Sequence, residues 1–271
     1  MQLSVPPTVT QNLARVKSLI GRGEPVRALD AFLAAVNEFE AAHVAGRARS
    51  GTEISIHECV DVCNGQAQIR KLLRDITKSD KAAIVYTPGA ESKLAAVLSI
   101  IRKALSEADA AKEKEAGDAI VKRKETLFAD ARAAFAAGEA PKARALLRRL
   151  GEEFGKEKGV LASLGYMLID AGFPLDAVPY LEQAIADFPR ESEPYSRLAS
   201  TYFEMREYEK AENTYRAAVK NIGMHPRTLT NLGKVYIAWN KREKAFEVLQ
   251  QAVRLDPEDK EIAALFAKVD R

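Results

Sequence analysis

Apolar residues recur three or four positions apart along most of the chain, which is the spacing of one face of an α-helix. In the second half this helical pattern itself recurs with a period of 34 positions. Shifting the sequence by that length brings four alanines into register, with a small residue twelve positions before each and a bulky residue four positions after it. The alanines are Ala143, Ala177, Ala211 and Ala245, the earlier small residues are Ala131, Gly165, Ala199 and Gly233, and the bulky residues are Leu147, Leu181, Tyr215 and Leu249.

Each of these repeat units is divided near its middle by a helix breaker or a polar pair. This division predicts two antiparallel helices of about three to four turns in each unit. Small residues at one level let the two helix axes approach closely, and bulky residues fill the space above and below them. Because one apolar face of such a hairpin stays uncovered, each hairpin has to stack on the next. The dividing points are Gly138, Gly172-Phe173-Pro174, Arg206-Glu207 and Asn240-Lys241.

This arrangement resembles the tetratricopeptide repeat (TPR) family, whose unit has the same length and the same order of large and small positions. Four units are assigned, at residues 124–157, 158–191, 192–225 and 226–259. The first departs most from the family pattern, with Asp130 where a leucine is usual and Gly155 where the proline falls. Residues 260–271 have apolar residues at helical spacing and are expected to form a capping helix. The resemblance implies an all-α solenoid that binds proteins and has no enzymatic activity.

The segment 10–42 is expected to form two helices that break at residues 21–23, the second starting with Pro25, a residue that suits the first helical turn. Its sequence echoes the start of the first repeat unit, with Ala28 in the role of Ala143. We therefore interpret it as a diverged repeat-like hairpin. An unrelated helical hairpin is the alternative.

Three further segments complete the first half before the long helix. Residues 46–53 are expected to form a polar loop, and residues 56–77 a single helix. The apolar segment 82–89 resembles a strand in composition, but one strand has no partner in a helical chain. A short helix or an extended connector is therefore favoured there.

A long helix is expected after Gly89. Its apolar stripe lies within residues 94–105, and residues 106–123 are rich in good helix formers but poor in large apolar residues. This charged segment is expected to be an exposed helical spacer, interrupted at Gly117 or continuous with the first repeat; a flexible linker is the alternative. The domains expected are 1–105, a spacer at 106–123, and the repeats with their cap at 124–271.

Composition excludes several classes of protein. The chain has 271 residues, of which 47% are apolar and 29% charged, so it can bury a core and is not a disordered chain. No window approaches the ~18 consecutive apolar residues of a membrane span. The first residues lack a secretory signal, and the two cysteines cannot build a disulfide scaffold. These features favour a cytoplasmic protein, of bacterial type, that has no membrane segment.

The distribution of charge disfavours nucleic-acid binding. Residues 1–123 hold 18 basic and 15 acidic residues, which leaves 23 of each for residues 124–271 and confines the net charge of +3 to the first half. Nucleic-acid-binding domains usually concentrate basic charge on one face. The nearest feature is a short basic stripe, interpreted as a solvated helix face, that consists of Lys142, Arg144, Arg148 and Arg149.

Motifs for catalysis or metal binding are weak. His57, Cys59 and Cys63 lie within seven residues, but no fourth ligand is evident and the cysteines are interpreted as core residues. The segment 151–156 only superficially resembles a phosphate-binding loop, and no histidine has a recognisable nucleophile nearby. The sequence therefore predicts no catalytic residue, no cofactor and no metal, with Cys59 and Cys63 as the weak candidates for a metal site.

In the TPR family the first helices of successive units line a concave groove that commonly holds a peptide. The resemblance therefore implies a protein or peptide partner, of unknown identity, bound by an apolar strip beside a polar row. The candidate positions are Tyr166, Ile169 and Asp170 from the second unit, Arg197, Ser200, Phe203 and Glu204 from the third, and Arg227, Asn231, Lys234 and Ile237 from the fourth.

One subgroup of the family grips the terminal carboxylate of chaperone tails with a lysine and an asparagine of one unit. Here Ala162 and Tyr166 stand at the matching positions, so half of that clamp is missing. Binding of a chaperone tail is disfavoured, whereas an acidic peptide remains compatible with the basic residues of later units. Alternatively, the apolar strip packs against an element of the chain itself, such as the first-half helices.

Three other functions compete with the adaptor hypothesis. A self-associating structural or regulatory protein would dimerise through the stripe at residues 94–105, which leaves a homo-oligomer open. The first half could bind nucleic acid, or Cys59 and Cys63 could sense a metal.

Overall fold

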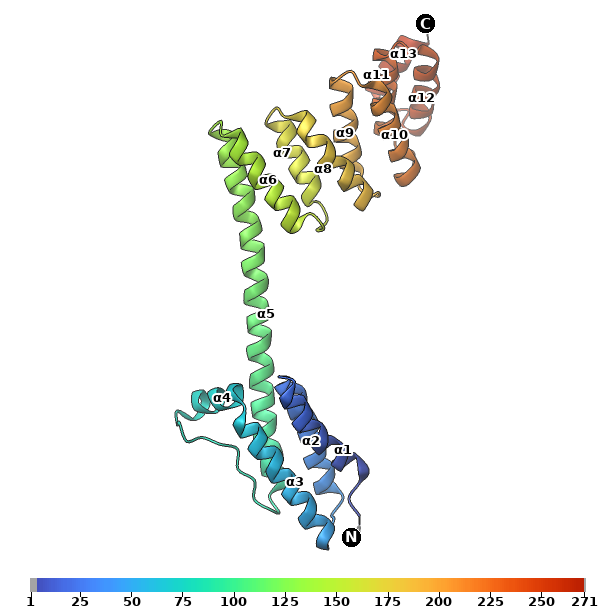
Figure 1. Ribbon diagram of the computed structural model, residues 1–271. Helices are drawn as coiled ribbons and strands as arrows, with labels where there is room; N and C mark the ends of the chain where they lie inside the picture. Colours follow the sequence, from blue (N-terminus) through green and yellow to red (C-terminus); the bar gives the residue numbers. More distant parts are fainter. Residues whose placement is uncertain (1–3, 271) are drawn as a thin grey trace. The chain divides into compact units, whose positions relative to one another are not determined.

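The computed structural model describes residues 4–270, and all regular secondary structure in that range is α-helical, with no strand. The described chain forms two compact units, divided between Ala119 and Ile120 (Figure 1). The all-α fold predicted from the helical period is confirmed. None of the helices in the described range combines the length and apolar character needed to cross a bilayer. The helices of unit 1 are α1 Pro7–Gly21, α2 Pro25–Ala41, α3 Gly46–Gly65, α4 Ala67–Thr77 and the first part of α5 Glu91–Ala136.

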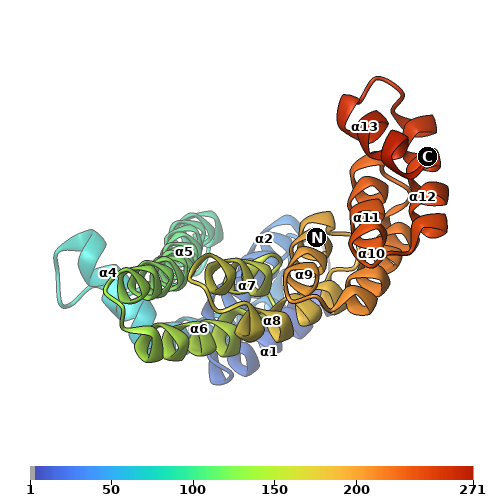
Figure 2. The same cartoon turned by 90° about the horizontal axis from the view of Figure 1, so that it is seen from above.

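Unit 2 begins with the end of α5 and continues as a regular series of helices. Seen from above, α7, α9 and α11 form one layer and α6, α8, α10 and α12 form the other (Figure 2). The two layers follow the alternation of first and second helices in the repeat units. The bounds are α6 Ala140–Phe154, α7 Val160–Asp170, α8 Pro174–Asp187, α9 Ser192–Glu204, α10 Tyr208–Ile222, α11 Pro226–Ala238, α12 Arg242–Leu255 and α13 Lys260–Val269.

The small and large repeat positions pack against each other inside unit 2. A Cβ atom on Gly165 would lie 2.6 Å from Cγ of Leu181, and one on Gly233 would lie 2.6 Å from Cδ2 of Leu249. Ala211, one of the four alanines of the repeat register, is fully buried. Close approach of the paired helices therefore depends on the missing side chains at the two glycines.

The turns inside the repeats share one backbone geometry. Gly138, Gly172, Arg206 and Asn240 follow one another at the repeat spacing, and all four have a positive φ, between 58° and 84°. Each of these residues donates its N–H to the carbonyl three residues earlier, and the next residue donates to the carbonyl five residues earlier. Paired bonds of this kind close a helix end around a left-handed residue.

The turn between α1 and α2 has the same geometry. Gly23 has a φ of 75°, its N–H donates to the carbonyl of Ile20, and the N–H of Glu24 donates to that of Leu19. Ala28, the counterpart of Ala143, is fully buried. The hairpin thus shares its turn with the repeats, and its origin as a diverged repeat stays a prediction.

Two expectations for the first half are wrong. Residues 46–53, expected to be a loop, form the first turns of α3, and the helix expected at 56–77 is broken between Gly65 and Ala67. The break is fixed from outside the helix, because the side-chain amide of Asn64 clasps the backbone of Ile84. Its Nδ2 donates to the Ile84 carbonyl at 2.9 Å, and the Ile84 N–H donates to its Oδ1 at 2.8 Å.

Residues 82–87 are an extended connector, as one of the two favoured alternatives had it. Ile84 and Tyr86 are buried, whereas Val85 between them is 74% exposed, so the segment alternates as a strand does. The amide of Asn64 supplies the two hydrogen bonds that a neighbouring strand would otherwise provide.

Helix α5 is continuous through residues 106–123, including Gly117, so the flexible-linker alternative is wrong. Its early apolar stripe is used within unit 1, because Leu94, Leu98, Ile101 and Leu105 are all at most 5% exposed. These four side chains therefore belong to the core of unit 1, whereas Val97 of the same stripe is 38% exposed, and dimerisation through residues 94–105 stays a prediction.

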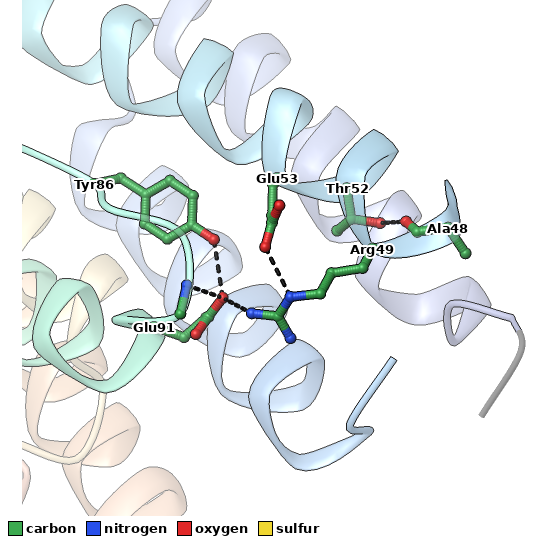
Figure 3. Close-up of polar contacts among 7 residues, drawn as sticks. Ala48, Arg49, Thr52, Glu53, Tyr86 and Glu91 are labelled. Carbon is green, nitrogen blue, oxygen red and sulfur yellow. Dashed lines mark hydrogen bonds and ion pairs between the residues drawn. The ribbon is translucent and has the colours of Figure 1, made fainter. Parts of the chain in front are cut away.

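A buried ionic cluster fastens the start of α5 to α3. One carboxylate oxygen of Glu91 accepts hydrogen bonds from Nη2 of Arg49 at 2.7 Å, the Tyr86 hydroxyl at 2.9 Å and the Gly89 N–H at 3.2 Å (Figure 3). Arg49 also pairs with Glu53 at 2.8 Å. Because Glu91 is only 4% exposed, its charge depends on these partners instead of water.

The same cluster sets the protonation of Glu91. Burial by itself raises the pKa of this carboxyl, but hydrogen bonds from its own backbone, Tyr86 and Gly89, together with the charge of Arg49, outweigh burial and hold the pKa below its ordinary value. The folded state therefore favours the charged form of Glu91. Its contribution to the stability of unit 1 is fully present at pH values above the pKa of a glutamate in the unfolded chain, about 4–4.5.

Acid is accordingly expected to loosen the connector of unit 1. As the pH falls through the lowered pKa of Glu91, its stabilising contribution is lost, and hydrogen exchange of residues 82–98 should accelerate. In Glu91→Gln, which has no carboxylate at this site, that acid-dependent component should be absent. The matched variant Glu58→Gln, which breaks the exposed pair with Lys17 instead, should keep it. Equal acid dependence in the wild type and Glu91→Gln would contradict this assignment.

Candidate functional site

The predicted groove residues lie on α7, α9 and α11, the layer on the inner side of the curved row in Figure 2. Because these helices are related by one repeat, side chains 34 positions apart fall at equivalent places. Ile169, Phe203 and Ile237 form the apolar row. The polar rows are Tyr166, Ser200 and Lys234, then Asp170 and Glu204, and then Arg197 and Asn231.

The apolar row is only partly covered. Ile169 and Phe203 are half-buried against the core, and Ile237 is 37% exposed. The Phe203 ring lies 5.9 Å from that of Tyr208, which lies 6.2 Å from that of Trp239. The row therefore borders a half-exposed aromatic cluster, a surface that suits the apolar side chains of a partner.

Several charged groove residues are already paired. The guanidinium of Arg197 lies 5.2 Å from the ring centre of Tyr166 and 3.8 Å from a carboxylate oxygen of Asp170, so it bridges α7 and α9. Lys234 pairs with Glu261 of α13 at 2.6 Å. Among the described residues, Arg227 has no carboxylate within ion-pair distance. Of the predicted basic groups it is the one available to a new anion.

Arg227 and Asn231 line a cavity of about 600 Å³ between α9 and α11. Glu193 and Ser196 line it from α9, and Thr228 lines it from α11. The sequence analysis missed these three residues. The signal for Glu193 was present, because it stands 34 positions before Arg227 and is its repeat equivalent.

A smaller pocket of about 190 Å³ lies at the preceding interface, between α7 and α9. Tyr166 lines it with Ala162, and Glu191 and Glu193 supply its charged groups. The two matching positions of the chaperone-tail clamp thus border an acidic pocket. Both glutamates are already paired, Glu191 with Lys158 at 2.6 Å and Glu193 with Arg197 at 4.0 Å, so the pocket offers a terminal carboxylate no unpaired cation.

The buried hydroxyl of Tyr215 lies beneath the groove. Burial raises the pKa of Tyr215, while hydrogen bonds with Ser200 and Asn231 act in the opposite direction. The Tyr215 side chain is 2% exposed and packs in the core of the repeats.

The metal hypothesis finds no support at the cysteines. Burial raises the pKa of Cys59 to about 11 and that of Cys63 to about 12, so both remain neutral thiols near pH 7. His57 packs with its ring 4.9 Å from that of Tyr86. Within residues 4–270, no cluster of three or more histidine, cysteine, aspartate or glutamate side chains is arranged to hold a metal ion.

Comparison with known proteins identifies the second half of the chain. Family models described as tetratricopeptide repeat match residues 168–227 and 226–259, roughly a third of the chain. The resemblance inferred from the period of the sequence is thereby confirmed for residues 168–259. Neither match covers the first unit, 124–157, which departs most from the family pattern.

A curated relative is the protein O-mannosyl-transferase Tmtc3 of Drosophila melanogaster, 33% identical over 101 residues. The match covers 37% of this chain but only 11% of that protein. Among solved structures, MamA is similar with a TM-score of 0.45 and 18% identity, over 54% of this chain and 80% of that one. The second TPR domain of human RPAP3, in complex with an HSP70 peptide, has a TM-score of 0.38 and 18% identity, over 41% and 92% of the two chains.

Proposed function

Since residues 168–259 are tetratricopeptide repeats, we propose that the chain is a non-catalytic adaptor that binds a segment of a partner protein along α7, α9 and α11. The observation that carries the proposal is the 600 Å³ cavity that Arg227 lines together with residues of α9 and α10, with the half-exposed apolar row further along α9 and α11. Binding would need little reordering, because stacked helices already hold these side chains in place.

The chemistry of the groove selects the partner segment. Arg227 and Asn231 offer donors to a carboxylate, and Phe203 with Ile237 offers an apolar surface roughly two to three turns further along the helices. The partner segment would therefore carry an acidic residue near an apolar one. The acidic pocket at Tyr166 disfavours a chaperone-type terminal carboxylate, although the RPAP3 domain has been solved with an HSP70 peptide.

The test is a double substitution, Phe203→Ala with Arg227→Glu, in the full chain. Partners recovered by affinity purification are quantified against the wild type by mass spectrometry. We expect at least one partner to be reduced tenfold or more, since truncating a central aromatic anchor typically costs about 2 kcal/mol or more of binding energy.

The matched control is Leu255→Ala with Arg254→Glu, which makes the same kinds of change at exposed positions of α12. It should leave the recovered partners unchanged. If the groove variant folds normally and retains every partner of the wild type, recognition by α7, α9 and α11 is excluded.

A further inference from the structure

The outer side of the repeat stack contains a periodic polar bridge. At two successive interfaces a tyrosine of a first helix donates its hydroxyl to a glutamate of the preceding second helix, and a lysine lies over its ring. Tyr202 bonds Glu182 at 2.7 Å, and Lys210 is 5.5 Å from the ring centre. Tyr236 bonds Glu212 at 2.7 Å, and Lys244 is again 5.5 Å from the ring centre.

The first interface, between α6 and α7, lacks this bridge. Leu168 stands one repeat before Tyr202, so this position has no hydroxyl that could donate to the preceding second helix. The bridging charges are absent there as well. Arg148 stands one repeat before Glu182 and Asp176 one repeat before Lys210, although an arginine at this position, Arg216, also occurs in α10, where Glu212 makes the bridge.

A pocket of about 290 Å³ opens at this place. Leu147 and Leu168, both essentially buried, line it together with Tyr180, and Leu175 borders it with 70% of its surface exposed. Pro179 and three charged residues, Arg144, Arg148 and Asp176, complete the lining. A second pocket of about 300 Å³ shares Arg148 and Tyr180, so the cavity continues along the outer face.

The two arginines differ in their availability. Arg144 pairs with Asp176 at 2.8 Å and lies 4.3 Å from the ring centre of Phe173. Arg148 has no carboxylate within ion-pair distance in the part of the chain that the structure describes. The basic stripe, interpreted from the sequence as a solvated face, therefore borders an apolar pocket and includes one unpaired guanidinium.

We propose that this outer pocket binds an aromatic side chain, flanked by acidic residues, of a partner protein. The ring would occupy the space that Leu168 leaves where the later repeats use their own tyrosines; an apolar cavity of about 150 Å³ already accommodates benzene. A neighbouring carboxylate would accept hydrogen bonds from Arg148, whose sign is opposite to that of Glu182. The site is separate from the groove of α7, α9 and α11 and does not depend on it.

The probe is a fluorescein-labelled twelve-residue peptide with one phenylalanine flanked by glutamates, titrated against the full chain by fluorescence anisotropy. Two variants remove the site in different ways. Leu168→Tyr with Arg148→Glu rebuilds the tyrosine–glutamate bridge of the later repeats and closes the pocket. Leu175→Glu places a carboxylate on an exposed position, where it cannot disturb the core. Both should weaken peptide binding at least tenfold.

Three controls decide the outcome. Because the groove is also proposed to bind an acidic residue near an apolar one, the pocket variants are compared in the background of the groove variant Phe203→Ala with Arg227→Glu, where they should still weaken peptide binding at least tenfold. Peptides with alanine for phenylalanine, or lysine for glutamate, should bind at least tenfold more weakly. The proposal is overturned if the wild type shows no binding at 1 mM, if the pocket variants bind unchanged, or if the groove variant alone loses binding.

Discussion

Replacing Leu249 by alanine is expected to lower the free energy of unfolding of the last repeats by about 2–5 kcal/mol. Leu249 is fully buried and packs onto the backbone of Gly233, so the deletion removes apolar contacts and leaves a cavity between α11 and α12. The chain's one tryptophan, Trp239, follows α11 directly and reports on this region. Urea unfolding followed by tryptophan fluorescence gives the change.

The companion substitution Gly233→Ala tests the same contact from the other side. Its new Cβ would lie 2.6 Å from Leu249, and such overpacking costs about 1–3 kcal/mol, against a gain of about 1 kcal/mol in helix propensity. With Leu249→Ala already present the clash disappears, so the same substitution should then stabilise. Such a reversal in the sign of the stability change would show that residues 233 and 249 are in direct contact.

Gly117→Ala is the matched control, because a Cβ there meets nothing within 4 Å in the exposed middle of α5. It should be neutral or stabilising, by up to about 1 kcal/mol. If Gly233→Ala stabilises the wild type as Gly117→Ala does, the close approach of α11 and α12 is wrong. The stacking argument would then lose its physical basis.

The repeats could be predicted from sequence because the nesting partners belong to one periodic pattern. Gly233 and Leu249 lie in neighbouring helices of one hairpin, and each has a counterpart one repeat earlier, in Ala199 and Tyr215. The turns inside the repeats could also be predicted, because they depend on residues that are neighbours in sequence. Arg206 and Asn240 show a positive φ at the positions where the polar pairs predicted a break.

The first half was harder because its decisive contacts are distant in sequence. The Asn64-Gly65 pair is a local turn signal that the helical pattern of residues 56–77 masked, whereas the contact of Asn64 with Ile84, twenty residues away, has no local signal. Residues 46–53 were assigned to a loop for their polarity, yet Arg49 pairs with both Glu53 and the buried Glu91.

The same contrast between local pattern and distant contacts applies to the two candidate binding surfaces. Positions along α7, α9 and α11 follow from the repeat, whereas whether a side chain there is free depends on its neighbours. Lys234 is occupied by Glu261, and Arg227 has no such partner among residues 4–270. On the outer face, the stripe containing Arg148 gave no sign of a pocket, because the other lining residues, Leu168 among them, lie on different helices.

Arg49→Ala is expected to destabilise unit 1 by about 1–3 kcal/mol, because it leaves the buried carboxylate of Glu91 without its cation. The effect is smaller than for a fully buried pair, since Arg49 itself is 32% exposed and water can replace part of its charge. Hydrogen exchange of residues 82–98 should accelerate accordingly, while Trp239 in unit 2 should unfold at an unchanged urea concentration.

Arg102→Ala is the control that distinguishes the effect of burying an ion pair from the effect of the ion pair itself. Arg102 bonds Asp30 at 2.7 Å, the same distance as the pair of Arg49 with Glu91, but Arg102 and Asp30 are both nearly half exposed. An exposed pair contributes about 0–1 kcal/mol, so exchange in residues 82–98 should change little. Equal effects of the two substitutions would mean that burial of Glu91 adds nothing to the pair. The connector would then be held by the Asn64 clasp and the packing of Ile84 and Tyr86 alone.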